Sequence, residues 1–579
     1  MKYLIIGGVA GGATTAARLR RNDENAEIIM FERGEFISYA NCGLPYYLGG
    51  TISDRENLFV QTPEKFYQTL RIETRTKSEV TSINRQEKTI TVKETDSGKE
   101  YQETYDKLVL SPGAMAIRPP IPGIDSEGIF TLRNVPDTDL IKNFMNQYKP
   151  KRAVIVGAGF IGLEMAENLH SQGIFVTIVE MADQVMNILD YEMAAEVHQH
   201  LKTKNVEFYL NDGVASFEKE DSLLKVKLNS GRTLQTDMVI LSIGVRPENQ
   251  LAKDAGLSIG QTNGIVVNKF MQTNDPDIYA LGDVIEFENP VSGTTGVIPL
   301  AGPANKQGRI VADNIVHGNI KAYPGTIATG IAKVFDLTVA STGMPEKTLK
   351  RLNIVHHSFV FHATDHAGYY PGAIPMSIKV VFSPKTGKLL GAQIVGYQGV
   401  DKRIDLFAAV IGMGGTIWDL QNIEHSYAPP FSSAKDPVNL AGFIAENIFD
   451  GTSRHVNWCD IAECVKKENT VKNMSLIDVR SPEEYQQGSI PGSINIPNTE
   501  LRTRIGEIPK DKPVVVYCGV GLRGYLAERI LRQQGFDDVR NLSGGYHTYS
   551  QVTQTQSNED IFEGYYIGKD DHIYQNTEK

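Results

Sequence analysis

Two cysteines of this chain stand in surroundings that could support sulfur chemistry. The first, Cys42, lies in the segment SYANCGLPYY (38–47), and the next cysteine is Cys459. A solitary thiol reacts by forming a mixed disulfide, a persulfide or a sulfenic acid. Gly43 and Pro45 predict that Cys42 begins a helix, whose positive end would lower the thiol pKa and favour the thiolate. The alternative is a buried cysteine that acts as a small hydrophobic residue.

The second cysteine, Cys518, ends a predicted strand, VVVYC, and opens a loop that leads into a helix. Glycines let such a loop curl, so that successive backbone N–H groups face one centre. This cradle, the helix terminus and Arg523 would together stabilise a sulfur anion. The loop consists of Gly519, Val520, Gly521, Leu522 and Arg523.

The stretch around Cys518 resembles a rhodanese domain, which implies that Cys518 carries a persulfide. The motifs DVR (478–480) and GGY (544–546) fit the same family, whereas Ser489 stands where the family often has His. Phosphatases of this fold have five residues between Cys and Arg, and this chain has four, so sulfur transfer is favoured. The alternative is a catalytically idle domain.

A glycine-rich turn with the spacing of a dinucleotide site follows the predicted strand AVIV (153–156). Gly157, Gly159 and Gly162 would let the backbone approach a pyrophosphate at the start of the next helix. Glu180 follows about 20 residues later, where a carboxylate accepts hydrogen bonds from ribose hydroxyls. A carboxylate repels a 2′-phosphate, so NADH is expected in preference to NADPH. The alternative is a tight turn with a structural role only.

A second turn, GGVAGG (7–12), has Val9 in place of the central glycine and is weak by itself. It gains support from Glu32, from the segment TNDPDIYALGD (273–283) and from Ser111-Pro112-Gly113. In this order, the motifs resemble the pyridine nucleotide-disulfide oxidoreductase family over residues 1 to about 450. The resemblance implies FAD and NADH as cofactors, with Asp283 on the ribityl chain. It implies these cofactor contacts: Gly7, Gly8, Ala10, Gly11, Gly12, Glu32, Arg33, Asn41, Val80, Ser111, Gly113, Arg133, Gly157, Gly159, Ile161, Gly162, Glu180, Gly244, Gly282, Asp283, Leu300 and Ala301.

The segment around Cys42 resembles the coenzyme A-disulfide reductase branch of that family, whose relatives include single-cysteine NADH oxidases and peroxidases. The resemblance implies a homodimer in which Tyr427, with Tyr369 or Tyr370, reaches the thiol of the other subunit. Their hydroxyls could act as general acids or hydrogen-bond donors. Core packing is the alternative for each tyrosine.

Coenzyme A carries phosphates, so its site needs cations. Arg18 and Arg21 lie on one face of the first predicted helix, and Lys435 follows Tyr427. Each could equally be a solvated surface charge. The coenzyme A contacts that the residues and the resemblance suggest are Thr14, Arg18, Arg21, Ser38, Asn41, Asn305 and Lys435.

Charge and composition narrow the class of protein. The formal net charge of −11 argues against non-specific nucleic-acid binding. The four cysteines contain no C-x-x-C pair, so neither a disulfide framework nor a metal site is expected, and a reducing, cytoplasmic compartment is favoured. No apolar run approaches the ~20 residues of a membrane span.

The pattern of elements predicts an α/β protein. Two Rossmann-like dinucleotide-binding domains are followed by an α+β dimerisation domain and an α/β rhodanese domain. The predicted boundaries are 1–112 and 246–325 for the FAD-binding domain, 113–245 for the NAD-binding domain, 326–450 for the dimerisation domain, 451–469 for a linker, 470–556 for the rhodanese domain and 557–579 for a tail.

These features predict an NADH-dependent flavoprotein that reduces coenzyme A persulfide, polysulfide or coenzyme A disulfide through Cys42, with a fused sulfurtransferase domain. One alternative is a water-forming NADH oxidase or peroxidase that uses a Cys42 sulfenate. Another is a sulfurtransferase or redox-sensing module. The physiological substrate stays open, as does direct movement of sulfur between Cys518 and Cys42.

Overall fold

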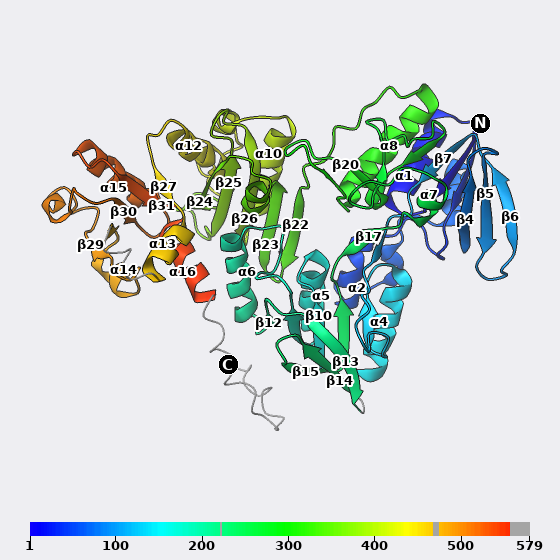
Figure 1. Ribbon diagram of the computed structural model, residues 1–579, viewed down its shortest axis with the longest axis horizontal. Helices are drawn as coiled ribbons and strands as arrows, with labels where there is room; N and C mark the ends of the chain where they lie inside the picture. Colours follow the sequence, from blue (N-terminus) through cyan, green and yellow to red (C-terminus); the bar gives the residue numbers. More distant parts are fainter. Residues whose placement is uncertain (221–222, 467–473, 556–579) are drawn as a thin grey trace.

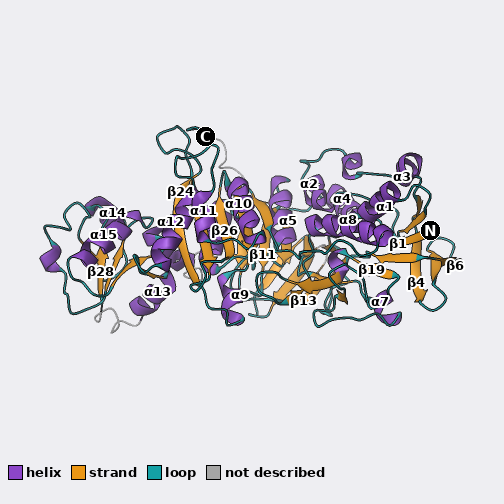
Figure 2. Cartoon of the chain, turned by 90° about the horizontal axis from the view of Figure 1, so that it is seen from above, coloured by secondary structure: helices purple, strands orange, loops and turns teal. Residues whose placement is uncertain are grey.

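Four units make up the molecule, from the blue N-terminal unit to the orange C-terminal unit in Figure 1, and Figure 2 shows the same chain from above. The computed structural model describes residues 1–220, 223–466 and 474–555, so the predicted tail lies outside the described residues. Each unit has its own five-stranded sheet, and the predicted fold class is confirmed. Among the residues that the structure describes, no helix combines the length and the apolar character of a membrane span.

The first unit is a parallel sheet with strand order β19-β7-β1-β2-β3, built from two separate stretches of chain. The inner strands β1 and β7 are apolar on both faces, as parallel strands covered on both sides are. Helices α1 and α8 pack against each other beside it. Its elements are β1 (Lys2–Ile6), α1 (Ala10–Asn22), β2 (Glu27–Phe31), β3 (Glu73–Arg75), β7 (Lys107–Leu110), β19 (Ile278–Ala280) and α8 (Ala301–His317). A small antiparallel sheet follows β3 and consists of β4 (Ser78–Asn84), β5 (Thr89–Glu94) and β6 (Glu100–Thr104).

The second unit repeats this architecture with strand order β12-β11-β10-β16-β9. In each unit, the strand before the glycine-rich turn and the next strand along the chain end in register. Ile6 pairs with Phe31 in the first unit, and Val156 pairs with Val179 in the second. The next residues, Glu32 and Glu180, therefore occupy equivalent places at the carboxyl edges of the two sheets. The elements are β9 (Ile129–Thr131), α4 (Val135–Tyr148), β10 (Arg152–Val156), α5 (Phe160–Ser171), β11 (Phe175–Val179), α6 (Tyr191–Thr203), β12 (Glu207–Tyr209) and β16 (Met238–Leu241).

The third unit is an antiparallel sheet with strand order β22-β23-β26-β25-β24, and α10 packs on β23 and β26. Its strands are β22 (Gly330–Val334), β23 (Leu337–Gly343), β24 (His357–Thr364), β25 (Pro375–Phe382) and β26 (Leu389–Gly396). Its helices are α9 (Glu346–Arg351), α10 (Val400–Gly412), α11 (Ile417–Asn422) and α12 (Pro437–Phe449).

A buried lysine joins the second and third units. Lys379 of β25 is 1% exposed, and its Nζ lies 3.0 Å from Asp190 and 2.5 Å from both Glu192 and Glu346. A buried ammonium group needs such partners, because an unpaired charge in the interior is strongly destabilising. These ion pairs fix how β25 sits against the N-terminal end of α6.

The fourth unit is a parallel sheet with strand order β27-β31-β30-β28-β29. Its elements are β27 (His455–Val456), α13 (Trp458–Lys466), β28 (Ser475–Asp478), α14 (Pro482–Gln486), β29 (Ile494–Asn495), β30 (Val514–Tyr517), α15 (Leu522–Gln533), β31 (Val539–Leu542) and α16 (Gly545–Thr555). Helix α16 packs on α6 of the second unit (Figure 1).

The structure differs from the prediction of a linker at residues 451–469. Residues 455–456 form the edge strand β27, which pairs with β31, and residues 458–466 form α13. Both elements belong to the fourth unit. A two-residue strand is too short to show a period-2 pattern, so its pairing depends on the distant strand β31. Residues 467–469 lie outside the described part of the chain.

Candidate active site

The first glycine-rich turn joins β1 to α1, which begins at Ala10. Gly7 has a φ of 100°, and a Cβ on Gly12 would lie 1.9 Å from the carbonyl oxygen of Gly7, so both positions require glycine. The backbone N–H of Gly8 donates to Oε2 of Glu32 at 2.9 Å. The carboxylate of Glu32 is thereby held beside the helix start, where ribose hydroxyls of a dinucleotide would bind.

The second turn, before α5, has the same construction. Gly157 has a φ of 99°, and a Cβ on Gly162 would lie 2.0 Å from the carbonyl oxygen of Gly157. Gly159, by contrast, faces open space, which leaves room for a pyrophosphate at the start of α5. The N–H of Ala158 donates to Oε2 of Glu180 at 2.7 Å. The chain therefore has two cradles of the dinucleotide type, and Ile161 is exposed on the first turn of α5.

A half-buried carboxyl group lies near the first cradle. Asp283 follows Gly282 in a 3₁₀ turn (Gly282–Val284), and the N–H of Gly282 donates to Gln307 of α8 at 2.8 Å. Burial raises the pKa of Asp283, and Arg133 opposes that shift. A half-buried acceptor of this kind fits the hydroxyl groups of a ribityl chain. Helix α8 begins at Ala301, after Leu300, without a side-chain cap. These groups fit FAD.

Some of the remaining predicted cofactor contacts lie where the chain passes between the first two units. Gly113 and Gly244 have φ values of 80° and 107° and flank the paired strands β8 (Ala114–Ala116) and β17 (Val245–Pro247). Ser111 donates its N–H to the carbonyl oxygen of Ile6 at 2.8 Å. Elsewhere, Val80 is buried in β4, a Cβ on Gly11 would meet Leu281 at 2.4 Å, and Arg33 pairs with Glu248 at 2.5 Å.

Cys42 lies in a 3₁₀ turn, Asn41–Gly43, that runs directly into α2 (Leu44–Leu48). The segment is attached to the first cradle, because the N–H of Ser38 donates to the carbonyl oxygen of Gly8 at 2.9 Å. Cys42 is exposed and is a free thiol.

The expected lowering of the Cys42 pKa is wrong for this chain. Partial desolvation of the thiol raises its pKa, and the charges of Glu164 and Asp283 raise it further. A backbone hydrogen bond opposes the shift but does not outweigh these causes. The prediction assumed a helix dipole, whereas the turn that holds Cys42 is a single 3₁₀ turn beside two carboxyl groups.

Glu164 is a site residue that the sequence analysis missed. It lies on α5, and the hydroxyl of Tyr46 on α2 donates to its Oε1 at 3.5 Å. Burial raises the pKa of Glu164 to about 7, with a further contribution from Glu167. The only local signal is its position two residues after Gly162. Its place near Cys42 arises from the packing of α2 on α5.

Tyr369 and Tyr427 come together on the third unit. Their hydroxyl oxygens are 2.9 Å apart, and the residues are 76% and 49% exposed. Tyr370 instead packs its ring against His366, with centroids 5.7 Å apart. The structure therefore pairs Tyr369, rather than Tyr370, with Tyr427.

The predicted coenzyme A residues fall into two groups. Thr14 of α1 donates to Asn305 of α8 at 2.5 Å, and Asn41 donates to the carbonyl oxygen of Arg133 at 3.4 Å. Arg18 lies on the same helix as Thr14, but its guanidinium pairs with Asp313 at 2.7 Å. Arg21 is exposed in the last turn of α1, and Lys435 is exposed in the segment before α12. Within one chain, the structure groups the α1 and α8 residues and leaves Lys435 on the third unit.

The loop after β30 holds the second candidate thiol. Cys518 is 1% exposed, and the N–H of Gly521, which has a φ of 118°, donates to its Sγ at 3.1 Å. Helix α15 begins at Leu522, so the sulfur faces a helix start. The N–H of Tyr546 donates to the carbonyl oxygen of Cys518 at 2.8 Å. Val520 and Leu522 form an exposed apolar rim.

Arg523 has a partner that the sequence analysis missed. Both of its terminal nitrogens bond to Glu484, at 2.6 and 2.7 Å, in a bidentate pair. Arg523 in turn lowers the pKa of Glu484 to about 2. The carboxylate therefore competes with any anion for the guanidinium. The signal was the capping box at the start of α14, where Glu484 pairs with Ser481.

The two flanking motifs of this unit support the loop. Arg480 pairs with the buried Asp478 at 2.7 Å, and its guanidinium lies 4.2 Å from the ring centroid of Tyr546. This stacking positions the start of α16, whose backbone holds the loop of Cys518.

Comparisons with known proteins agree with this geometry. The family of pyridine nucleotide-disulphide oxidoreductases matches residues 1–308, and the dimerisation domain of the same family matches residues 330–437. A rhodanese-like domain matches residues 462–551. The predicted family and the predicted rhodanese unit are thereby confirmed.

Three relatives show how far the similarity extends. Coenzyme A disulfide reductase of Staphylococcus epidermidis is 37% identical over 445 residues, which cover 77% of this chain and 100% of that protein. The crystal structure of reduced Bacillus anthracis CoADR-RHD is 52% identical with a TM-score of 0.93, and covers 96% of this chain and 98% of that one. An NAD-dependent persulfide reductase from A. fulgidus is 38% identical with a TM-score of 0.88, over 95% of this chain and 100% of that one.

Proposed function

Because the chain belongs to the pyridine nucleotide-disulphide oxidoreductase family, we propose that it uses NADH and FAD to reduce a sulfur–sulfur bond at Cys42. The substrate is coenzyme A persulfide, polysulfide or coenzyme A disulfide, and the fourth unit carries sulfane sulfur on Cys518. One observation carries the proposal. The Cys42 thiol is within electrostatic reach of both Asp283, from the FAD side, and Glu164, from the NAD side. A thiol between the two cradles is placed to exchange electrons with a flavin.

Atoms and electrons balance at Cys42 for coenzyme A disulfide and for coenzyme A persulfide. When bound, FAD would supply the hydride acceptor for NADH and the two electrons that the sulfur–sulfur bond needs. With coenzyme A disulfide, the Cys42 thiolate attacks one sulfur, forms a mixed disulfide and releases one coenzyme A thiolate. With coenzyme A persulfide, attack on the outer sulfur gives Cys42 persulfide and coenzyme A. Two electrons and the required protons then restore the Cys42 thiol. This step releases the second coenzyme A from the mixed disulfide, or sulfide from the persulfide.

The protein's own residues control the protons. Desolvation and Glu164 raise the pKa of Cys42, which favours the protonated thiol in the resting chain. The paired hydroxyls of Tyr369 and Tyr427 are exposed on the dimerisation domain. We infer that they act on Cys42 of a second subunit and donate to the departing thiolate. This arrangement requires a homodimer.

The fused rhodanese-type unit favours persulfide and polysulfide over coenzyme A disulfide. Cys518 sits at a helix start with a backbone N–H donated to its sulfur, as a persulfide carrier requires. It would accept sulfane sulfur and pass it to coenzyme A, which would bring it to Cys42. An oxidase or peroxidase that works through a Cys42 sulfenate needs no carrier of sulfane sulfur.

An anaerobic assay tests the proposal. NADH oxidation and sulfide release are measured with coenzyme A disulfide, coenzyme A persulfide and inorganic polysulfide, for the full-length holoenzyme and its Cys518→Ser variant. We expect NADH turnover with all three and sulfide from the last two. The Cys518→Ser variant should keep coenzyme A disulfide reduction and lose sulfur transfer from thiosulfate. Faster NADH consumption with oxygen or peroxide than with any sulfur compound would overturn the assignment.

A further inference from the structure

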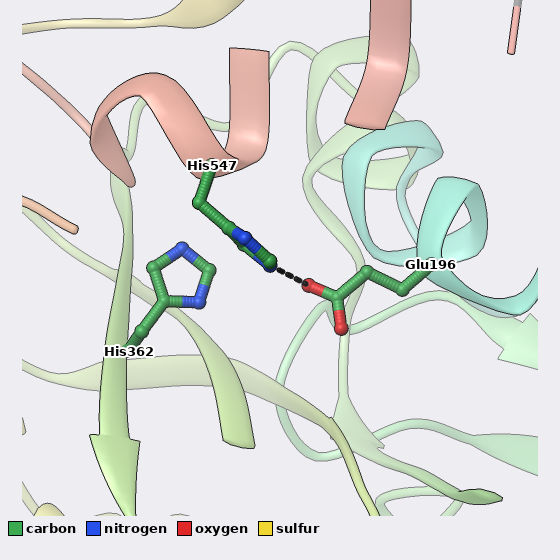
Figure 3. Close-up of side chains that lie close together, drawn as sticks. All are labelled: Glu196, His362 and His547. Atoms are coloured by element: carbon green, nitrogen blue, oxygen red, sulfur yellow. Dashed lines mark ion pairs between the residues drawn. The ribbon is translucent and has the colours of Figure 1, made fainter. Parts of the chain in front are cut away.

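Three polar side chains from three different units meet where the rhodanese-type unit packs on the rest of the chain. Glu196 comes from α6, His362 from β24 and His547 from α16 (Figure 3). One ligand atom from each lies within 4.8 Å of the other two. The two rings and the carboxylate face one another, and none of the three is part of the chemistry proposed above.

The hydrogen bonds of His362 fix which of its nitrogens is free. Its Nε2 lies 3.2 Å from the carbonyl oxygen of Gly544 and 3.0 Å from the hydroxyl of Thr548. A carbonyl oxygen only accepts, so Nε2 carries the proton and Nδ1 has the lone pair. A histidine that donates one N–H to a carbonyl and presents its other nitrogen is arranged as metal-binding histidines are.

The free nitrogen of His362 is linked to Glu196 through a hydroxyl group. Nδ1 of His362 lies 2.8 Å from the hydroxyl of Ser377, and the same hydroxyl donates to the carboxylate of Glu196. Ser377 therefore contacts both the free nitrogen of His362 and the carboxyl group of Glu196. His547 adds another nitrogen, with its Nε2 3.9 Å from Oε1 of Glu196. A cation at this point would satisfy all the acceptors together.

We propose that Glu196, His362 and His547 bind a divalent transition-metal ion, with Zn²⁺ as the representative case. Two imidazoles and a carboxylate suit this ion, with a water as the fourth ligand. Tetrahedral coordination needs ligand atoms about 3.3 Å apart, so the cluster must contract slightly. His547, whose side chain is 44% exposed, is the ligand that faces solvent.

The site would be structural and would act on the Cys518 loop through the backbone. The N–H of His547 donates to the carbonyl oxygen of Gly519 at 2.9 Å, and the N–H of Tyr546 donates to that of Cys518 at 2.8 Å. A metal held by His547 would therefore tie the persulfide loop to β24 and α6. Cysteine spacing predicted no metal site, and it gives no information on these three ligands, which are far apart in the sequence.

The test uses the full-length, FAD-loaded enzyme after treatment with a chelator. Bound zinc is measured by equilibrium dialysis, and its ligands by X-ray absorption at the zinc edge. We expect a site with nitrogen and oxygen ligands, including imidazole, and no sulfur. The Glu196→Gln and His547→Gln variants should weaken binding by at least ~100-fold, whereas His317→Gln, at an exposed histidine of α8, should leave it unchanged.

Folding of the variants is checked by their FAD content and their metal-free sulfurtransferase activity, which should match those of the wild type. Zinc held by sulfur, or the same affinity in wild type, Glu196→Gln and His547→Gln, would overturn the proposal. A zinc-dependent rise in melting temperature that is lost in His547→Gln and kept in His317→Gln would support it independently.

Discussion

The hydroxyl oxygens of Tyr369 and Tyr427 lie 2.9 Å apart, although the residues come from different loops of the dimerisation domain. In such a pair, one hydroxyl donates to the other, and the acceptor's own proton points to a third group. The paired hydroxyls can thus present one proton to a substrate sulfur while the second tyrosine stabilises the charge left behind. Tyr370, which packs on His366, lacks this arrangement.

Loss of either paired hydroxyl should slow reduction. We expect Tyr369→Phe and Tyr427→Phe to lower kcat with coenzyme A disulfide by about 100-fold, the lower end of the effect of a positioned acid. Tyr370→Phe is the matched control and should stay near the wild-type rate. Steady-state NADH oxidation measures all three. A large loss in Tyr370→Phe, with Tyr369→Phe unaffected, would contradict the pairing.

Glu164 should control the acidity of the redox thiol. Its negative charge raises the pKa of Cys42, so Glu164→Gln should lower that pKa and increase the thiolate fraction at a given pH. At pH values below the pKa of the wild-type Cys42 thiol, the thiol of the variant should therefore be alkylated faster.

The measurement is the pH profile of iodoacetamide labelling at Cys42, followed by peptide mass spectrometry in a Cys518→Ser background. Glu56→Gln, which removes an exposed carboxylate, serves as the control. A Glu164→Gln profile that coincides with that of the control, or lies at higher pH, would rule out this role.

Glu180 should set the preference for NADH. The carboxylate is held by the N–H groups of Ala158 and Ala182, at 2.7 and 2.9 Å, in the place that ribose hydroxyls approach. Glu180→Gln keeps the shape and removes the charge, so kcat/KM for NADH should fall roughly tenfold. Activity with NADPH should rise, because the repulsion of the 2′-phosphate is removed. Unchanged kcat/KM values for both coenzymes would exclude Glu180 from the site.

The pair of Arg523 and Glu484 should limit sulfurtransferase activity with anionic donors. Glu484→Gln frees the guanidinium, and the KM for thiosulfate should fall by about tenfold, as expected for one new charge-assisted contact. The pair is well exposed, so little change in stability is expected. Coenzyme A disulfide reduction by the reductase units is the internal control. A higher KM in Glu484→Gln would show that the carboxylate orients Arg523 rather than competing for it.

The sequence predicted features whose parts lie close together along the chain. Each glycine-rich turn and its glutamate fall within one βαβ unit, so spacing alone located Glu32 and Glu180. The Cys518 loop was found in the same way. The short strand β27 was taken for a linker, because only its pairing with β31 makes it part of a sheet.

Long-range packing explains what the sequence could not predict. Glu164 reaches the surroundings of Cys42 only because α2 packs on α5, and its charge adds to the desolvation that raises the thiol pKa against expectation. Glu484 meets Arg523 across two elements of the rhodanese-type unit. The cluster of Glu196, His362 and His547 depends on the contact between three units.

The most direct test of the account identifies the sulfur that first bonds to substrate. The Cys518→Ser holoenzyme, with its thiols reduced and its FAD oxidised, is mixed with coenzyme A disulfide without NADH. Its peptides are then examined by mass spectrometry. We predict a mixed disulfide of coenzyme A on Cys42, and a loss of NADH-dependent reduction of at least ~10³-fold in Cys42→Ser. An adduct on Cys459 or Cys464, with turnover retained in Cys42→Ser, would contradict the central claim.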